Sequence, residues 1–522
     1  MIQNCDSIIK YSDKAYLYAN TDSLCDFTVR SMIDEVKSCI DIHSNSIESI
    51  IDSLDRALLN KIETYLLTYN RDELMIALLS LKATLRSRMS SHEVTDDFDI
   101  STRHEEILHL INIVIFTDNS KFKNKSLLHG SKNLALTFRL AYFYNVFQDN
   151  VKHIRLNNAK HYDIDDFFKA GIFYNDQIDK YFDTTLDTTP DIEIPEESRI
   201  KSQVILDYMK KIGCDFESIQ NSFSVISKTH FGFDLSELNL FIFYGLRQVP
   251  PQFLIAEYKE NYSALINVSI EAVESIINVF SLNRVVHFNN KLLDTNRLIE
   301  LRSIYEIGDK IIFLPFDLVY NYSCFEKMLI KRHFVEYFSV SISELNNELE
   351  RALDKIEERI SSFISYVLVD RLLEHGYKLP MKNKTPCAEI KSIPANNVNI
   401  LKNKGDIDVL ALDSTKKQIF NFELKFYKPL LNIEEVNSNH KIDERRKNIT
   451  KLLERQRLLE DNIKFVIEYF GESSEDADAY IVRSILVSPR PDYWMMQLKG
   501  KDGTYDYYHW SELIRRIEGK II

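Results

Sequence analysis

Glycine is scarce in this 522-residue chain, with 12 residues, and neither G-x-G-x-x-G nor G-x-x-x-x-G-K-[ST] occurs. A glycine-rich loop that cradles nucleotide phosphates is therefore not predicted. The six cysteines are scattered and no two form a C-x-x-C pair, so neither a zinc ribbon nor a dense disulfide framework is indicated. The pattern predicts isolated, reduced thiols.

Long uninterrupted apolar runs are also missing. Arg139 breaks the segment LALTFRLAYFYNVF, and Glu271 and Glu274 break ALINVSIEAVESIINVF, so neither reaches the roughly 18 residues of a membrane span. The N-terminal stretch MIQNCDSIIKYSDK lacks the apolar centre of a signal peptide. We therefore expect a cytoplasmic protein with no membrane partner.

The balance of charge is acidic. A formal net charge of −13 weighs against a nucleic-acid partner, although an acidic chain can still carry one basic face. Aromatic residues are plentiful, with 31 Phe and 27 Tyr, so there is ample material for hydrophobic cores. The length exceeds what one core normally supports, which indicates two to four domains.

Helical periodicity dominates the first two thirds of the chain. Residues 1–185 place apolar side chains at three- and four-residue spacing, as in SIESIIDSLDRALLNKIETYLL, and are predicted to form a helical domain. The segment DTTLDTTPDIEIPEES, residues 183–198, is predicted to be a linker. Residues 199–340 return to helical spacing, except that two strand-like runs flank Gly308-Asp309 within 303–319 and predict a short β-hairpin.

The region 341–522 has a different order of elements. A long helical pattern stops near Gly376, a glycine suited to a helix C-terminus. A hairpin, a helix at about 441–464, the strand YIVRSILVS and the closing helix SELIRRI follow. The predicted fold class is thus multidomain: a mostly α-helical N-terminal region and a C-terminal α/β domain with a sheet flanked by helices.

The C-terminal hairpin carries unusual charges. In GDIDVLALDSTKKQIFNFELKFYK, strand alternation places Asp406 and Asp408 on one face of the first run, and Glu423 and Lys425 on one face of the second. A turn centred near Thr415 puts Asp408 opposite residue 422 or 423. Directly opposed side chains have Cβ atoms about 4.5–5.5 Å apart, so two carboxylates there repel unless a proton or a cation lies between them.

This arrangement suits metal-assisted hydrolysis. Mg²⁺ is held by one or two carboxylates together with waters and substrate phosphate. Lys425 follows Glu423 by two residues, about 6.5–7 Å along the same face, where an ammonium can orient a water or offset charge on a phosphate. Two carboxylates, a metal and a lysine are the parts of phosphodiester hydrolysis. The alternative is a solvent-exposed hairpin with weak Asp–Lys pairs.

These residues resemble a known family. G-D-I-D, with Asp408 followed fifteen residues later by the glutamate of F-E-L-K, is similar to the PD-(D/E)xK nuclease superfamily, and most closely to Holliday-junction-resolvase-like and Mrr-like domains. The resemblance covers about 340–522 and implies a restriction-endonuclease-like mixed sheet flanked by helices. It also implies Asp408, Glu423 and the Leu424 carbonyl as metal ligands and Lys425 as the catalytic lysine. No proline precedes Asp408, and the role of the additional acid Asp406 stays open.

The family often adds two further residues. A glutamate on the helix before the hairpin corresponds to Glu357 in IEERI, with Glu358 as the close competitor and a charged solvent face as the alternative. A glutamine on the helix after the hairpin corresponds to Gln456 in KLLERQRLLED, where an ordinary surface residue is the alternative.

A basic stripe on the latter helix is a candidate substrate contact. Lys447, Lys451 and Arg455 recur every four residues, and Lys441, Arg445 and Arg446 lie at the same end. Such a stripe can contact phosphates without reading sequence. Because Glu444, Glu454 and Glu460 are interspersed, a salt-bridged surface helix is the alternative.

Together these observations predict a Mg²⁺- or Mn²⁺-dependent nuclease. We expect DNA rather than RNA as the substrate, although the residues themselves do not choose between them. The N-terminal helical region is expected to bind a protein partner or a second copy, and a role in antiviral defence or restriction is expected by analogy of fold. A catalytically inactive nucleic-acid-binding or assembly protein, and a helical interaction scaffold, are the other hypotheses.

Overall fold

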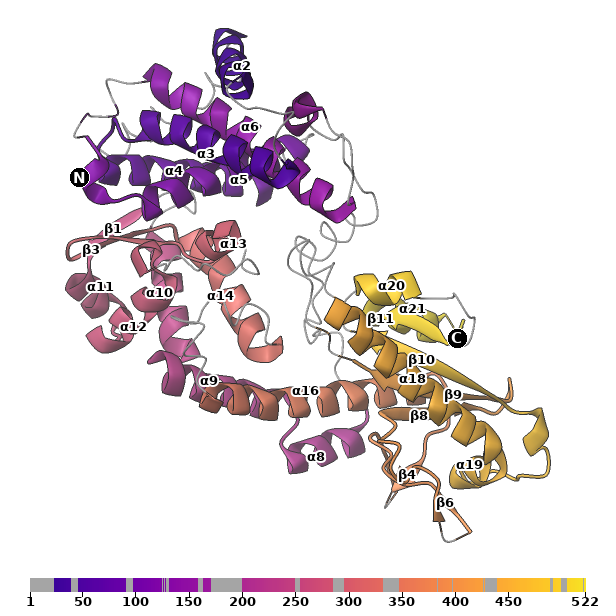
Figure 1. Ribbon diagram of the computed structural model, residues 1–522. Coiled ribbons are helices and arrows are strands. Elements are labelled where there is room, and N and C mark those ends of the chain that lie inside the picture. Colours follow the sequence, from indigo (N-terminus) through magenta and orange to yellow (C-terminus); the bar gives the residue numbers. More distant parts are fainter. Residues whose placement is uncertain are drawn as a thin grey trace. The chain divides into compact units, whose positions relative to one another are not determined.

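The computed structural model describes residues 23–38, 46–90, 97–123, 125, 127, 131–157, 163–169, 200–248, 254–284, 295–331, 347–382, 384–396, 398–425, 427, 439–488, 492–498, 505–519 and 521–522. The chain is mostly helical and forms two compact units (Figure 1). The first draws its described residues from 1–174 and 224–328, and the second from 175–223, 329–333 and 346–522. The predicted linker at 183–198 lies outside the described residues.

The N-terminal part of the first unit is helical, as predicted. Its helices are α2 (Ser23–Ser38), α3 (Ile47–Leu66), α4 (Arg71–Ser90), α5 (Asp97–Phe116) and α6 (Ser131–Asn157), with 3-10 turns η1 (Asn119–Lys121) and η3 (Ile164–Phe168). In α3 the Ser46 hydroxyl accepts from the Ser49 N–H, and Leu54, Leu58 and Ile62 are buried at four-residue spacing. The periodic apolar face therefore became the core, as expected of amphipathic helices.

The rest of the first unit combines helices with a three-stranded sheet. The elements are α10 (Leu235–Gln248), β1 (Ile255–Tyr258), α11 (Lys259–Ile266), α12 (Ile270–Phe280), η6 (Leu282–Arg284), α13 (Thr295–Glu300), β2 (Ile304–Ile307), β3 (Lys310–Phe313) and α14 (Pro315–Lys331). The hairpin predicted at Gly308-Asp309 is confirmed, because β2 and β3 pair across a turn in which Gly308 has φ 58°. Strand β1, in sheet order β1-β3-β2, was not predicted.

Two polar contacts tie the parts of the first unit together. The Tyr305 hydroxyl donates to Asp72 at 2.8 Å and joins β2 to α4. The Lys82 ammonium of α4 lies 2.8 Å from the Asp317 carboxylate of α14, and both side chains are buried. A buried charge needs such a partner, so the Lys82–Asp317 pair fixes how α4 and α14 meet.

No single helix among the described residues is both long and apolar enough to cross a membrane. Helices α11 and α12 pass that test together by length and composition, but they are bent by 115° at the break between them.

The second unit contains the predicted C-terminal sheet. Four strands lie in the order β11-β10-β9-β8, namely β8 (Val409–Asp413), β9 (Gln418–Leu424), β10 (Ile481–Ser488) and β11 (Asp506–His509). Strands β8 and β9 are antiparallel, whereas β10 is parallel to both β9 and β11. The sheet is thus mixed and packs against helices, as predicted, although β11 was not foreseen.

The second unit also contains helices. They are α8 (Gln203–Ile212), α9 (Phe216–Phe231, which continues into the first unit), α16 (Asn347–Glu374), α18 (Asn439–Asp461), α19 (Ile463–Tyr469), α20 (Tyr493–Leu498) and α21 (Trp510–Glu518), with η8 (Ala477–Ala479). Small hairpins are formed by β4 (Met381–Lys382) with β5 (Thr385–Pro386) and by β6 (Pro394–Ala395) with β7 (Val398–Asn399).

The end of α16 is a Schellman motif. Gly376 has φ 86°, its N–H donates to the Leu373 carbonyl at 3.1 Å, and the Tyr377 N–H donates to the Leu372 carbonyl at 3.0 Å. The predicted stop at Gly376 is confirmed. The Tyr377 ring then packs edge-on against Phe420 of β9, with centroids 5.8 Å apart, so the cap also fixes α16 to the sheet.

The chain between β9 and β10 covers the other face. Because β10 is parallel to β9, the connection has to cross over the sheet, and α18 and α19 make that crossover (Figure 1). Leu459 of α18 and Val466 of α19 share a buried cluster with Leu410, Leu412 and Ile419. The face that carries the charges of the hairpin therefore lies under α18.

Candidate active site

The β8–β9 turn fixes the register of the hairpin. The Asp413 carboxylate accepts from the backbone N–H groups of Thr415 and Lys416 at 2.9 and 3.0 Å, which closes a tight polar turn. The ladder then runs from Asp413 opposite Gln418 to Val409 opposite Phe422. Continued by one residue, this register places Asp408 across from Glu423, which decides between the two predicted partners.

Polarity changes along the covered face of the hairpin. Near the turn this face holds the buried Leu412 and Ile419. One step further along β9 it holds Asn421, whose amide donates to the Ser484 hydroxyl at 3.0 Å although both residues are buried. At the open end come Asp408 and Glu423. The apolar end packs into the core, and the polar end holds the candidate site residues.

Asp408 immediately precedes β8. Residue Ile407 pairs with Ile390 rather than with β9, and the Asp408 carboxylate accepts from the Leu424 N–H at 2.6 Å. Burial, and then the neighbouring Glu423 carboxylate, raise the pKa of Asp408 to about 7, while Lys425 and the Leu424 N–H lower it. A carboxyl group that titrates near neutrality is thus held beside a second carboxylate.

Glu423 is buried, with 4 % of its surface exposed, and two cations hold it. The Lys425 ammonium lies 2.7 Å from Glu423 Oε1. The Arg455 guanidinium of α18 pairs with Glu423 Oε2 through Nη2, and its Nη1 donates to the Asp406 carbonyl. Arg455 therefore connects the crossover helix to β9 and to the segment that precedes β8.

The inward position of Arg455 corrects the predicted basic stripe. Arg455 is 3 % exposed, and Arg445 is 1 % exposed with its guanidinium 2.7 Å from the Asp492 carboxylate, so neither lies on a surface that contacts phosphates. The reason is helical geometry: each four-residue step turns about 40° around the helix, so a stripe that begins outside at Lys447 has turned inward by Arg455. Arg455 instead shares the buried side of α18 with Leu452 and Leu459.

The structure places the remaining predicted residues on α16, on α18 and before β8. Glu357 is half-buried on α16 and Glu358 is exposed there. Gln456 donates to Glu460 at 2.9 Å, one turn along α18. Asp406 is half-exposed, 3.9 Å from Lys391. Among the described residues no group of three or more His, Cys, Asp or Glu is placed to hold a metal, so the roles of Glu357 and Gln456 stay predictions.

Sequence reasoning missed the role of Arg455 and the position of Glu389. The Glu389 N–H donates to the Asp408 carbonyl at 2.8 Å, and the Ser362 hydroxyl of α16 donates to the Glu389 carboxylate. Glu389 has φ 52°, a left-handed conformation that is uncommon outside glycine. No motif marks Glu389, whereas the three- and four-residue spacing of Leu452, Arg455 and Leu459 was the signal that Arg455 faces inward.

The donor set at the open end fits a divalent cation with two protein carboxylates. Asp408 and Glu423 repel each other, as the raised pKa of Asp408 indicates, and a cation relieves this repulsion. The N–H and C=O of one strand residue point the same way, so the Leu424 carbonyl lies on the side of Asp408. Glu423 Oε1 is paired with Lys425, so it would be open to a cation only if Lys425 turned away. Mg²⁺ typically accepts few protein ligands and keeps several waters.

Comparisons of this chain with family models, with curated proteins and with solved structures found no match.

Proposed function

We propose that the second unit is a divalent-metal-dependent nuclease of the PD-(D/E)xK type that hydrolyses phosphodiester bonds of nucleic acid. The observation that carries the proposal is the proximity of the Asp408 and Glu423 carboxylates at the open end of a hairpin, with the Lys425 ammonium 2.7 Å from Glu423. The mixed sheet flanked by helices supports the same fold type. DNA as the substrate, a cytoplasmic location and a role in antiviral defence remain parts of this proposal.

In this proposal Asp408, Glu423 and the Leu424 carbonyl hold Mg²⁺ or Mn²⁺. When bound, the metal supplies Lewis-acid stabilisation of charge on the phosphate and a water of lowered pKa. Arg455 keeps the Glu423 carboxylate in place through Oε2. A second hydrogen bond, from Arg455 to the Asp406 carbonyl, links the Glu423 carboxylate to the segment that precedes Asp408.

Lys425 has the reacting role. Freed from Glu423, its ammonium orients the attacking water and offsets the negative charge that develops on the phosphate. The water oxygen forms a bond to phosphorus, and its proton passes to solvent. The bond from phosphorus to one ester oxygen breaks, and that oxygen takes up a proton to leave as a hydroxyl. The products are one phosphate monoester and one alcohol.

The test is cleavage by the purified full-length protein. Labelled double-stranded, single-stranded and branched DNA, and RNA, are incubated with Mg²⁺, with Mn²⁺ or with EDTA. Lys425→Ala and Asp408→Asn should each lower the rate about 10²–10³-fold, whereas Lys464→Ala, which changes an exposed lysine on α19, should not. Wild type that cuts no faster than Lys425→Ala and Asp408→Asn would show that the proposal is wrong.

One observation favours a second candidate, a nuclease-fold protein that binds nucleic acid or assembles without cutting. Both carboxylate oxygens of Glu423 are already paired, one with Lys425 and one with Arg455, which is how a site that no longer binds metal is stabilised. Nucleic-acid binding that is unchanged by EDTA, together with no cleavage of any substrate, would support this candidate instead.

A further inference from the structure

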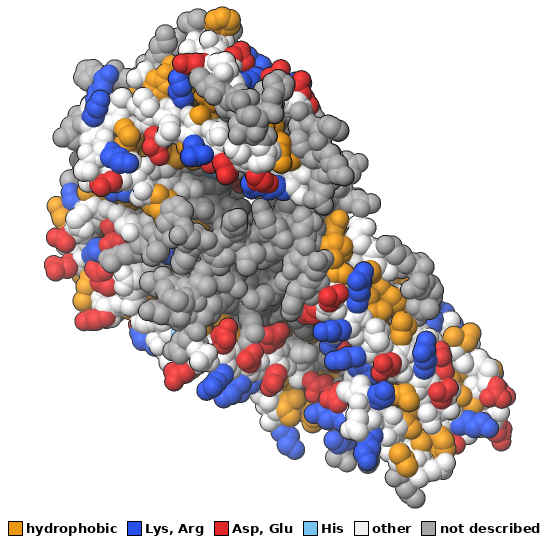
Figure 2. All heavy atoms as spheres, viewed as in Figure 1, with side chains coloured by type: hydrophobic (Ala, Val, Ile, Leu, Met, Phe, Trp, Pro, Cys, Tyr) orange, Lys and Arg blue, Asp and Glu red, His pale blue; other side chains and the backbone are white. Residues whose placement is uncertain are grey.

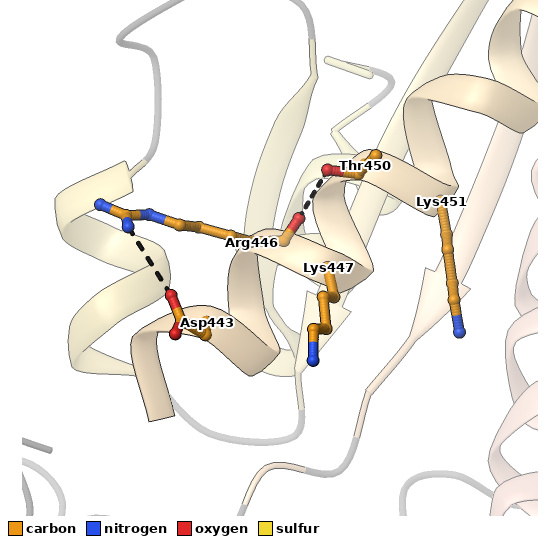
Figure 3. Close-up of a pocket in the computed structure, with 5 residues that line it drawn as sticks. All are labelled: Asp443, Arg446, Lys447, Thr450 and Lys451. Atoms are coloured by element: carbon orange, nitrogen blue, oxygen red, sulfur yellow. Dashed lines mark hydrogen bonds and ion pairs between the residues drawn. The ribbon is translucent and has the colours of Figure 1, made fainter. Parts of the chain in front are cut away.

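The outer side of α18 forms a basic hollow. A depression of about 400 Å³ is lined by Asp443, Arg446, Lys447, Thr450 and Lys451, all from the first four turns of the helix (Figure 3). In Figure 3 the side chains of Lys447 and Lys451 extend in the same direction, away from the helix axis. Both residues are exposed. We call these five residues the α18 hollow.

The α18 hollow carries an excess of positive charge. Its only carboxylate, Asp443, lies 3.8 Å from the Arg446 guanidinium, and the Thr450 hydroxyl donates back to the Arg446 carbonyl at 2.9 Å. In the described part of the chain no carboxylate lies within ion-pair distance of Lys447 or Lys451. Two exposed ammonium groups thus remain for an external anion.

The α18 hollow lies about one helical turn from Arg455, the residue that pairs with Glu423. Lys451 precedes Arg455 by four residues, about 6 Å along the helix, and Arg455 forms an ion pair with Glu423. Lys447 lies one further turn away. Helix α18 therefore carries the buried Arg455, which pairs with a candidate metal ligand, and the exposed Lys451 and Lys447, one and two turns before it.

We infer that the α18 hollow binds phosphates of a nucleic-acid backbone and so directs the substrate to the Asp408–Glu423 pair; the direction of the substrate rests on the proposed nuclease function. The chain as a whole, at −13, repels a polyanion, so attraction has to come from a local patch. Among the described side chains visible in Figure 2, acidic and basic residues are interspersed. Flexible ammonium groups in a row suit a repeated phosphate, since they bind it as point charges without reading bases.

The test is the salt dependence of binding. Fluorescence anisotropy with labelled duplex DNA, duplex RNA and a glutamate-rich peptide is measured in EDTA for the full-length protein and for a Lys447→Ala/Lys451→Ala variant. Loss of two phosphate contacts should reduce the slope of log K against log salt by about 1.8, so that the weakening between about 50 and 200 mM salt becomes about 12-fold smaller. The control is Lys382→Ala/Lys464→Ala, which removes two exposed lysines outside α18 and should keep the wild-type slope.

The outcomes separate this inference from the proposed function. If wild type and the Lys447→Ala/Lys451→Ala variant show the same slope, or if only the acidic peptide loses binding, the α18 hollow does not bind nucleic acid. If the slope falls as expected but wild type cleaves nothing in Mg²⁺ or Mn²⁺, the hollow stands as a nucleic-acid surface and the nuclease proposal fails. If cleavage occurs while the slope is unchanged, only the inference about the hollow is overturned.

Discussion

Replacement of Arg455 by methionine should destabilise the second unit selectively. Arg455 and Glu423 are 3 % and 4 % exposed, so Arg455→Met leaves a buried carboxylate with one cation fewer. Loss of one partner of a buried pair typically costs about 3–5 kcal/mol. Lys425 still lies 2.7 Å from Glu423, and we therefore expect the lower end, about 3 kcal/mol.

A second substitution, at Glu423, distinguishes the cost of the broken ion pair from the cost of the lost Arg455 packing. In Glu423→Gln/Arg455→Met no buried charge remains unpaired between these positions, and replacement of a buried ion pair by neutral groups is often close to neutral. The double variant should therefore be more stable than Arg455→Met alone, by about 1–2 kcal/mol. The matched control is Arg446→Met on the same helix, because that side chain is 64 % exposed and its pairing is worth less than about 1 kcal/mol.

The measurement can be confined to the right part of the chain. The sequence has 2 tryptophans, Trp494 in α20 and Trp510 in α21, and both belong to the second unit. Urea unfolding followed by tryptophan fluorescence thus reports on the unit that contains Arg455. A cost below about 1 kcal/mol for Arg455→Met, or a double variant less stable than the single one, would refute the buried-pair reasoning.

Three further predictions concern charge and backbone. Because the pKa of Asp408 is raised from 3.8 to about 7, the folded state keeps a proton that the unfolded state has released. The wild type should therefore lose up to about 4 kcal/mol of stability relative to Asp408→Asn as pH rises from about 4 to 7, and parallel urea midpoints would contradict this. Mg²⁺ at about 100 times its Kd should stabilise the second unit by about 2.7 kcal/mol in wild type but not in Asp408→Asn; an equal rise in both would remove Asp408 from the ligands. Gly232→Ala should lower the thermal midpoint more than Gly213→Ala, since both have positive φ but only at Gly232 would a Cβ lie 2.5 Å from the Ser275 hydroxyl; equal losses would show that the contact is relieved.

Local patterns predicted the hairpin because its determinants are local. The turn is closed by Asp413 within its own loop, and register follows from the turn, so Asp408 and Glu423 had to be neighbours. The helix cap at Gly376 was predictable for the same reason, since the Schellman motif involves only adjacent residues.

Features that depend on distant segments were not predicted. Strands β1 and β11 have four residues each, too few for periodicity to distinguish a strand from a helix, and they are strands because they pair with segments far along the chain. Arg455 was assigned to the outer basic stripe because it follows Lys447 and Lys451 at four-residue spacing. Its buried guanidinium is paired with Glu423, 32 residues earlier, and donates to the Asp406 carbonyl, 49 residues earlier, and no window of local sequence contains these partners.

The charges at the candidate site explain why two cations accompany two carboxylates. With Asp408 and Glu423 ionised, Lys425 and Arg455 bring the formal sum of this buried group to zero, which lowers the cost of burial without a metal. A divalent cation added to the group changes the formal sum to +2, which offsets the combined charge of −2 of one phosphodiester and one hydroxide. The two cations differ in what they can do next. Arg455 is buried and also bonded to the Asp406 carbonyl, so it stays, whereas the Lys425 side chain is 34 % exposed and free to turn from Glu423 toward a phosphate. In the proposed reaction, the ion pair that stabilises the metal-free fold would thus supply, on release, the ammonium that acts on the phosphate.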